Sequence, residues 1–423
     1  MRELVATING HFVGRLREQN NLWVFEYDPA WIAAGFDLSP HLRRAAGTIL
    51  DGATSRPVQW FFDNLLPEEQ ARDLLAADAK IPAADAFGLL AYYGKESAGA
   101  ITLRAPGEAV GRSGYVPLTD AELSDRIKRL PKQSLAAGAP KRMSLAGAQH
   151  KLAVSIVNGS LYFPEGESLS THLLKPDHVD RDNWPNSVAN EFFTMRLAER
   201  MGLRVPTVQM RYVPEPVYLI ERFDRQQMGE ETRRLHIIDA CQLLGLDRTF
   251  KYQQATIQTF TNIIEQCTNR ARARQDIASW VLFNLLTGNA DAHLKNLSFH
   301  VDAEGVQLAP FYDLVSTESY HTAPGSSPQW PNTRLSTRIG EAATFAQVNA
   351  ESFTEFARSL GLTRSAIKRL LADYTGKIET TADDLIEEFE GMTVAAATRA
   401  GQIRMIRTAR TIVIGEMAAK LRP

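Results

Sequence analysis

A polar loop that follows a strongly apolar helical segment constrains this 423-residue chain more than any other feature. Residues 277–286 (IASWVLFNLL) predict a buried helix. Thr287–Asn296 (TGNADAHLKN) follows, then a short predicted hairpin, and then Pro310–Asp313 (PFYD). Two aspartates and an asparagine thus stand after a buried helix and across a hairpin.

This arrangement of Asp291, Asn296 and Asp313 is the one that phosphoryl transfer requires. Asp291 would orient the hydroxyl of the nucleophile and accept its proton, while Asn296 and Asp313 would hold Mg²⁺ against nucleotide phosphates. Oxygen ligands suit Mg²⁺, which keeps several waters and needs few protein ligands. Each residue alone is equally typical of a loop cap or a turn. The combination predicts a phosphotransferase.

Composition excludes several other classes of protein. Hydrophobic residues make up 44% of the chain and charged residues 23%, which is typical of a globular protein and not of a disordered one. The formal net charge of −2 argues against a protein held to nucleic acid mainly by bulk charge. The two cysteines, Cys241 and Cys267, offer neither a disulfide framework nor a zinc ribbon. With no apolar run near the ~20 residues of a membrane span and no signal peptide, we expect a soluble cytoplasmic protein with no membrane partner.

The pattern of elements predicts three domains in an α+β fold. Asn9-Gly10 and Asn158-Gly159 are signals for two-residue hairpins, and Pro57–Lys80 has helical spacing. A Gly- and Pro-rich stretch, residues 104–117, marks a boundary, and beyond Asp224 the chain is expected to be mainly helical. We therefore expect an N-terminal α/β domain that braces a small lobe, the β-rich small lobe itself, and a helical large lobe: residues 1–105, 106–225 and 226–423.

A lysine and a glutamate upstream strengthen the prediction. Lys175 ends an apolar strand, and Glu191 lies on the apolar side of the next helix, which Asn186 or Ser187 can cap. A carboxylate on an apolar face is costly unless it is paired. Lys175 is the natural partner, as in the strand lysine and helix glutamate of kinases. The alternative is that Glu191 lies only at the edge of the apolar face of this helix, with its carboxylate in solvent.

Two further stretches fit a nucleotide site only because of where they stand. Glu221–Asp224 (ERFD) closes the last strand before the helical part, where the hinge of a two-lobed kinase binds the adenine edge. No GxGxxG loop is present, but Met143–Lys151 contains Ala146, Gly147 and Ala148, whose small size lets backbone N–H groups approach a phosphate. Alone, the first is typical of a strand end and the second of any small-residue loop.

Taken together, these residues resemble the HipA serine/threonine kinases, the toxin halves of bacterial HipBA toxin–antitoxin modules. The resemblance spans most of the chain. It rests on motifs in the order and spacing of that family: Phe61–Pro67, Gly94–Ala100, Ser144–Gln149, Leu173–Pro176, Glu221–Arg225, Asp291–Asn296 and Phe311–Asp313. The chain departs from the family pattern at His150 and within the Asp291–Asn296 loop, without loss of the chemical groups.

The resemblance implies a two-lobed protein-kinase-like fold and an ATP- and Mg²⁺-dependent protein kinase. Asp291 is then the catalytic base, Asn296 and Asp313 bind the metal, and Ser144 is the autophosphorylation site whose modification switches the enzyme off. The residues that the resemblance places at ATP are Ala146, Gly147, Ala148, Gln149, His150, Lys151, Lys175, Glu221, Arg222, Phe223, His293, Leu294, Lys295, Asn296, Tyr312 and Asp313. The implied partners are a HipB-like helix-turn-helix antitoxin, operator DNA mainly through that antitoxin, and an aminoacyl-tRNA synthetase as substrate.

Other functions stay open at the level of sequence. The Asp291–His293–Asn296 spacing is also similar to that of phosphoinositide-type lipid kinases, so a lipid or small-molecule kinase is an alternative. A non-catalytic corepressor that supports a DNA-binding partner is another. Arg364 and Lys368 could touch DNA phosphates, although such residues usually form a solvated helix face. Residues 317–334 have loop-like composition and are interpreted as an activation segment that binds protein substrate.

Overall fold

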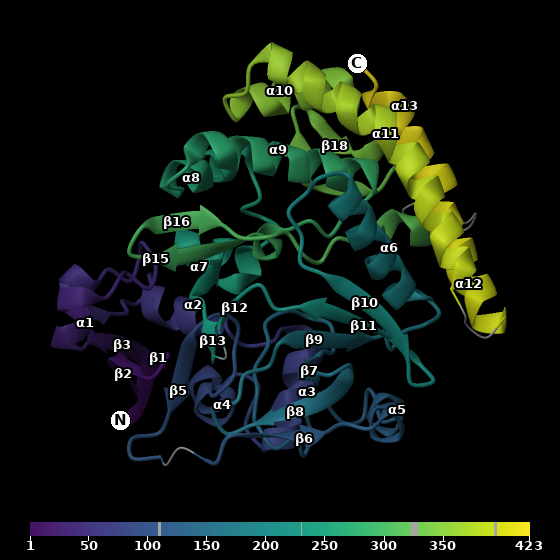
Figure 1. Ribbon diagram of the computed structural model, residues 1–423. Coiled ribbons are helices and arrows are strands. Elements are labelled where there is room, and N and C mark those ends of the chain that lie inside the picture. Colours follow the sequence, from purple (N-terminus) through teal and green to yellow (C-terminus); the bar gives the residue numbers. More distant parts are fainter. Residues whose placement is uncertain (109–110, 230, 323–328, 393–395) are drawn as a thin grey trace. The chain divides into compact units, whose positions relative to one another are not determined.

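The computed structural model describes residues 1–108, 111–229, 231–322, 329–392 and 396–423 (Figure 1). The chain forms two compact units, each assembled from separate stretches. The first unit comprises Met1–Val179, Arg211–Phe250 and Ser298–Ala309, and the second comprises Asp180–Met210, Lys251–Leu297 and Pro310–Pro423. The predicted three-domain division stays a prediction.

A five-stranded sheet opens the first unit, with strand order β4-β3-β2-β1-β5. Asn9 (φ 48°) and Gly10 (φ 81°) turn β1 into β2, which confirms the predicted hairpin because a type I′ turn needs positive φ at both residues. The strands are β1 (Arg2–Ile8), β2 (His11–Gln19), β3 (Leu22–Tyr27), β4 (Thr48–Leu50) and β5 (Ile101–Arg104).

The helices beside this sheet differ from the prediction in one respect. The helical spacing of Pro57–Lys80 belongs to two helices, because Pro67 has no N–H for a helix and restricts the residue before it. Pro67 instead forms a bridge with Gly147. The elements are α1 (Pro29–Ala34), the 3₁₀ turn η1 (Arg44–Ala46), α2 (Pro57–Asp63), α3 (Glu69–Ala79) and α4 (Ala86–Tyr93).

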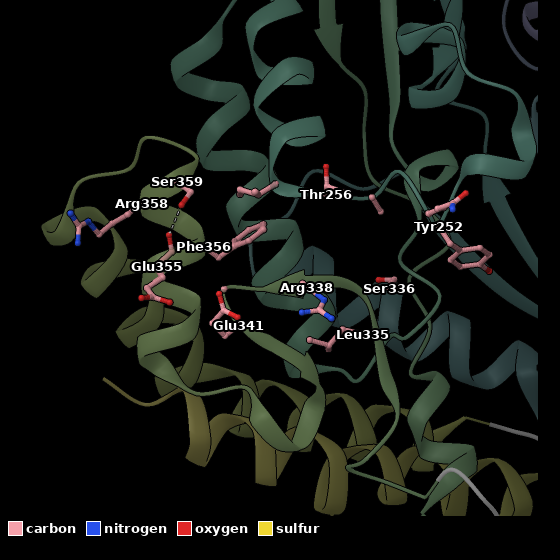
Figure 2. Close-up of a pocket in the computed structure, with 14 residues that line it drawn as sticks. Tyr252, Thr256, Leu335, Ser336, Arg338, Glu341, Glu355, Phe356, Arg358 and Ser359 are labelled. Carbon is pink, nitrogen blue, oxygen red and sulfur yellow. Dashed lines mark hydrogen bonds between the residues drawn. The ribbon is translucent and has the colours of Figure 1, made fainter.

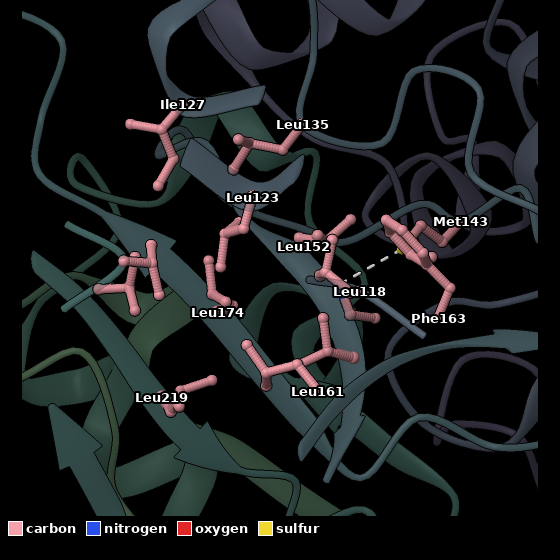
Figure 3. Close-up of a cluster of buried hydrophobic side chains, with 14 of the residues drawn as sticks. Leu118, Leu123, Ile127, Leu135, Met143, Leu152, Leu161, Phe163, Leu174 and Leu219 are labelled. Carbon is pink, nitrogen blue, oxygen red and sulfur yellow. Dashed lines mark hydrogen bonds between the residues drawn. The ribbon is translucent and has the colours of Figure 1, made fainter. Parts of the chain in front are cut away.

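A second sheet has six strands in the order β10-β11-β9-β7-β8-β6. A buried apolar cluster covers it, in which Leu123 and Ile127 of α5 pack with strand residues such as Leu152 and Leu174 (Figure 3). Asn158 and Gly159 form the predicted turn between β7 and β8. The elements are β6 (Gly114–Pro117), α5 (Asp120–Lys128), β7 (Leu152–Val157), β8 (Ser160–Glu165), β9 (His172–Pro176), β10 (Val208–Tyr212) and β11 (Pro216–Glu221).

The expectation that the chain is mainly helical beyond Asp224 is wrong for the next stretch. Three short strands follow, and the last of them, Ile237–Asp239, pairs with residues 298–300, some sixty residues further along the chain. Strands of three or four residues are too short to show a clear period in the sequence. The elements here are β12 (Arg225–Met228), β13 (Glu231–Arg234), β14 (Ile237–Asp239), α7 (Ala240–Leu244), η2 (Arg248–Phe250), β15 (Ser298–Asp302) and β16 (Gly305–Leu308).

Helices dominate the second unit. The 28-residue α11 is its longest element, and α12 and α13 lie along it (Figure 1). The helices are α6 (Ser187–Arg200), α8 (Ile257–Gln266), α9 (Arg270–Leu286), α10 (Ala350–Ser359), α11 (Arg364–Gly391), α12 (Ala396–Thr408), the π-helical η6 (Ala409–Ile414) and α13 (Gly415–Leu421). Arg364 and Lys368 are exposed on α11.

Short elements connect these helices. They are the 3₁₀ segments η3 (Leu294–Asn296), η4 (Thr317–His321) and η5 (Phe345–Gln347), and the hairpin strands β17 (Arg334–Ile339) and β18 (Ala342–Thr344). Within the predicted activation segment, residues 323–328 lie outside the described residues. Across the described ranges, no helix is both long and apolar enough to cross a bilayer.

Candidate active site

The polar loop begins where α9 ends, and its first residues are held tightly. Gly288 has φ +61°, and a Cβ there would lie 2.5 Å from Val413 Cγ1, so the position needs glycine. The Asn289 side chain donates to Asn284 Oδ1 at 2.8 Å and accepts from the Asp291 N–H at 3.0 Å. The buried helix thereby fixes the backbone that carries Asp291.

The structure brings Asp291 and Asn296 together. Asn296 is buried in η3, and its Nδ2 donates to the Asp291 carbonyl at 3.0 Å. The carboxylate of Asp291, in contrast, is exposed. The loop therefore holds the backbone of Asp291 and leaves its carboxylate accessible to a substrate.

The side chain of Tyr252 contacts the Asp291 carboxylate. The Tyr252 hydroxyl donates to Asp291 Oδ1, and the Tyr252 ring meets the ring of His293 edge-on at 5.0 Å. A backbone hydrogen bond joins the segment that carries Tyr252 to the polar loop, since the Leu294 N–H donates to the Lys251 carbonyl at 3.2 Å. A phenol O–H thus occupies the place where a hydroxyl donor would meet a general base.

The second aspartate lies on a segment that is hydrogen-bonded to the same loop. The Tyr312 hydroxyl donates to the Lys295 carbonyl at 2.6 Å. Phe311 stacks on Trp280 of α9 at 6.2 Å. Asp313 adopts φ 59°, a left-handed conformation that costs a non-glycine residue energy and occurs often at functional sites. These contacts tie the Asp313 segment to the loop that carries Asn296.

The donor atoms of Asn296 and Asp313 fit a hard cation. Because Asn296 Nδ2 is committed to the Asp291 carbonyl, its Oδ1 is the atom left for a ligand. A carboxylate and an amide oxygen are the kind of ligands that Mg²⁺ accepts beside phosphates and water. Among the described residues, no group of three or more His, Cys, Asp or Glu side chains gathers as a metal cluster.

In the first unit, the predicted phosphate loop packs on the α2–α3 connection. Gly147 bridges to Pro67, and the Glu68 N–H donates to the Gly147 carbonyl at 3.2 Å. Gly147 has φ +105°, and Lys151 Nζ donates to the Ala146 carbonyl at 2.6 Å. The N-terminal segment therefore braces this loop.

Ser144 stands at the start of that loop and is completely buried, with 0% of its surface exposed. Its Oγ donates to the Leu65 carbonyl at 2.9 Å, and its N–H donates to the Glu96 carbonyl at 2.7 Å. Ser144 thus hydrogen-bonds to two of the N-terminal motifs, Phe61–Pro67 and Gly94–Ala100.

The lysine and the hinge predicted from the sequence also lie in the first unit. Lys175 is buried on β9 opposite Tyr218 of β11, with its Nζ 5.7 Å from the Tyr218 ring. Glu221 is exposed at the end of β11, and Phe223 meets the His300 ring at 6.1 Å. Glu191 is buried on α6 of the second unit, and its pairing with Lys175 stays a prediction.

The Arg222 side chain belongs to a buried ion cluster that the sequence did not reveal. Its centre is Glu96, which is 0% exposed. Four cations contact its carboxylate at 2.6 to 3.1 Å: Lys141, Arg222, Arg225 and Arg234. Burial alone would raise the pKa of Glu96, but the surrounding cations, Arg234 foremost, hold that pKa well below its usual range.

Asp224 extends the cluster. It bonds Arg222 at 2.6 Å and accepts from the Gly99 N–H at 2.7 Å. Burial opposes ionisation, yet the neighbouring arginines lower the pKa of Asp224 to about 2. The Arg222 N–H also donates to the Thr171 carbonyl at 2.9 Å, and its carbonyl accepts from the Arg225 N–H at 3.2 Å. Since the guanidinium and the N–H are both occupied, the second lone pair of the carbonyl is what Arg222 can offer a nucleotide.

Two neighbours of the loop were not predicted from sequence to contact it: Tyr252, and Thr317, which was expected only as the first residue of the activation segment. The Thr317 hydroxyl accepts from the Ala290 N–H at 2.7 Å and donates to the Gly288 carbonyl at 3.1 Å. Neither residue stands in a motif, and Tyr252 precedes its partner by 39 residues. No signal in a single sequence could have found them.

Two features define a kinase-like protein. One unit is β-rich and contains a small-residue loop and a buried strand lysine. The other unit is helical and contains the loop in which Asn296 bonds the backbone of Asp291. Comparisons with known proteins agree. A profile of the HipA N-terminal domain matches residues 4–104, and a profile of the HipA-like C-terminal domain matches residues 143–382. The chain belongs to the HipA family.

Individual relatives support the same assignment. The chain is 32% identical over 406 residues to the putative kinase Y4mE of Sinorhizobium fredii. The matched region covers 92% of each chain. It is 34% identical over 314 residues to the serine/threonine-protein kinase toxin HipA of Shewanella oneidensis, or 70% of each chain. The solved complex of Shewanella oneidensis HipA, HipB and operator DNA has a matching chain with TM-score 0.80, 27% identity and 99% coverage of both. The predicted kinase-like α+β fold and the assignment as an enzyme of the serine/threonine kinase class are confirmed.

Proposed function

We propose that this protein is an ATP- and Mg²⁺-dependent serine/threonine protein kinase that acts as the toxin of a type II toxin–antitoxin module. The observation that carries the proposal is the Asp291–Asn296 loop, in which the asparagine side chain bonds the aspartate backbone and the carboxylate stays exposed. In a loop with a purely structural role, an accessible carboxylate beside an asparagine whose amide is already hydrogen-bonded would add no stability.

The chemistry follows from these positions. Asp291 receives the proton of a serine or threonine hydroxyl as that oxygen bonds the γ-phosphorus and the bond to the leaving ADP oxygen breaks. Asn296 Oδ1 and the Asp313 carboxylate would hold Mg²⁺, which when bound offsets the phosphate charge. Tyr312 keeps the Asp313 segment at the loop through its bond to Lys295.

Membership of the family suggests which residues bind the nucleotide. Lys175 contacts phosphates, and the backbone of Ala146–Lys151 covers them. Glu221, Phe223 and the Arg222 carbonyl contact adenine, while His293, Leu294 and Lys295 flank the phosphates beside Asn296. Support comes from the position of each residue within its own unit and from the family to which the chain belongs.

A HipB-like antitoxin is the proposed partner, and operator DNA is bound mainly through it. The relative in the solved Shewanella oneidensis complex is recorded with HipB and operator DNA, and it matches this chain over 99% of its length. The proposed substrate is an aminoacyl-tRNA synthetase, whose phosphorylation would arrest translation.

Ser144 is proposed as the site of autoinactivation. Its Oγ is a buried donor to the Leu65 carbonyl. A phosphate there would remove that donor and bring a charge of about −1.5 to −2 into a site that has no room for solvent. The loop would then move away from the α2–α3 connection. ATP affinity would fall, because the backbone N–H groups of the loop would move with it. Mass spectrometry of protein incubated with Mg-ATP should find one phosphate on Ser144, with ATP affinity falling in parallel; unchanged affinity would refute the switch.

The proposal is tested by comparing the phosphoproteomes of cells that express wild type, Asp291→Asn or Asp384→Asn. Asp384 is an exposed aspartate of α11 and serves as the matched control. We expect one or a few bacterial proteins, an aminoacyl-tRNA synthetase among them, to gain phosphoserine or phosphothreonine with wild type and Asp384→Asn only. Phosphorylated lipids or small molecules without any phosphoprotein would contradict a protein kinase.

A further inference from the structure

A pocket of about 810 Å³ lies in the second unit, and none of the residues that line it was predicted from the sequence as a site residue. Three segments line it: the loop 252–257 that leads into α8, the strand β17 with its turn (residues 335–341), and the end of α10 (residues 355–359) (Figure 2). Its volume lies within the range of ligand-binding pockets, about 300–1,000 Å³. Most of its rim is exposed, so it is open to a partner.

One wall of the pocket touches the candidate catalytic base. Tyr252 lines the pocket, is 45% exposed, and donates its hydroxyl to the Asp291 carboxylate. Its ring rests against His293 of the same loop. A molecule in this pocket is therefore separated from the base by a single side chain.

Charged side chains of both signs surround the pocket. Figure 2 shows Arg338 between Tyr252 and Glu341, with Arg358 at the end opposite Tyr252. Glu355 lies beside the turn, since its Oε2 is 2.9 Å from the position of a Cβ on Gly340. In the part of the chain that the structure describes, none of these four charged side chains forms an ion pair. Their charges are available to a ligand.

The backbone of β17 offers a second kind of contact. β17 and β18 form a sheet of two strands, so one edge of β17 has no strand beside it among the described residues. An extended peptide can add to such an edge through main-chain hydrogen bonds, while neighbouring pockets select its side chains. Half-buried Leu335 and Ile257 add apolar surface between the charges.

We infer that this pocket docks an extended segment of the protein substrate on one side of the phosphoacceptor. Arg338 receives an acidic side chain near the acceptor, and Glu341 with Glu355 receives a basic side chain farther from it. The Tyr252 hydroxyl occupies the position of the acceptor hydroxyl and moves off Asp291 when the segment binds. The inference rests on the proposed kinase function, because it names the substrate that the same site selects.

The experiment uses the full-length protein, Mg-ATP and peptides from a digested, dephosphorylated bacterial extract, with the phosphorylated sequences read by mass spectrometry. Wild type should select an acidic residue near the acceptor and a basic residue farther away on the same side. Arg338→Glu should replace the near acidic preference with a basic one and raise KM for the wild-type consensus peptide about fivefold to tenfold. KM for ATP should stay unchanged.

Arg369→Glu is the matched control, since Arg369 is an exposed arginine of α11 in the same unit that does not line the pocket. It should select the same peptides as wild type. Three results would overturn the docking inference: no charge preference in wild type, equal effects of Arg338→Glu and Arg369→Glu, or transfer to whole proteins but to no peptide. Absence of transfer to any protein or peptide would instead refute the kinase proposal, and the docking inference would fall with it.

Discussion

Carboxylates have opposite surroundings in the two units. In the first unit, Glu96 is wholly buried and held by four cations, and nothing can reach it. In the second unit, Asp291 is exposed, and its carboxylate meets the hydroxyl of Tyr252. The difference teaches that a charge saturated by buried partners can serve only structure, whereas a charge left accessible on a hydrogen-bonded backbone is available for chemistry. Substitution should therefore separate stability from activity.

Glu96→Gln should produce the largest loss of stability. It removes the charge of the carboxylate that four buried cations share, although Arg222 and Arg225 keep Asp224, and breaking a buried ion pair costs about 3–5 kcal/mol. Urea unfolding of the purified protein measures the loss. Glu165→Gln, at an exposed glutamate of β8, should change the free energy of unfolding by less than about 0.5 kcal/mol. Equal losses for the two variants would show that the cluster does not stabilise the first unit.

A buried carboxyl of the second unit should respond to pH in the opposite sense to the ion cluster. Glu318 is 1% exposed, and its N–H donates to the Gly288 carbonyl at 3.0 Å. Burial raises the pKa of Glu318 to about 7 from 4.5. The folded state then holds a proton that the unfolded state releases, so stability falls as pH rises from about 4.5 to 7 and levels off above, by up to about 3 kcal/mol.

Glu318→Gln should remove this fall, because the amide cannot ionise. Hydrogen exchange at the amides of residues 288–291 should speed up between pH 5 and 8 in wild type, beyond the intrinsic change of exchange rate, and not in the variant. By contrast, Asp224, whose pKa is lowered from 3.8 to about 2, contributes stability that is present above the unfolded-state pKa and is lost as pH falls from there through about 2. Identical pH profiles for wild type and Glu318→Gln would contradict the role given to this residue.

Tyr252→Phe should have the smallest effect and the most specific. Removing the hydroxyl frees Asp291 from its intramolecular donor, so KM for protein substrate should fall about twofold to fivefold while ATP affinity is unchanged. Steady-state kinetics measure both. Tyr115→Phe, at a tyrosine that is also 45% exposed, is the control and should behave as wild type. A large loss of kcat would mean that Tyr252 takes part in the chemistry instead of occupying the acceptor position.

Local chemistry is what sequence could predict here. Asn9-Gly10 and Asn158-Gly159 predict two-residue turns, because Asn and Gly tolerate the positive φ that both central residues adopt. Asp291 and Asn296 stand five residues apart, so one loop brings them together, and Tyr312 returns to that loop within a short hairpin.

What sequence could not predict depends on partners far apart in the chain. β14 finds its partner in β15, and Glu96 finds Arg234 across 138 residues. Tyr252 reaches Asp291 without any motif of its own. The pocket beside Tyr252 is built from three separate segments, so no single stretch carries its signature.

The central claim is that the exposed carboxylate of Asp291 performs phosphoryl transfer. The most direct measurement pairs calorimetric ATP binding with transfer of labelled γ-phosphate for wild type and Asp291→Asn. Asparagine keeps the shape of the side chain but cannot take a proton, so the variant should bind ATP and unfold as wild type does, while its transfer rate falls about 10²–10⁴-fold. Transfer at the wild-type rate by a folded Asp291→Asn protein would contradict the claim.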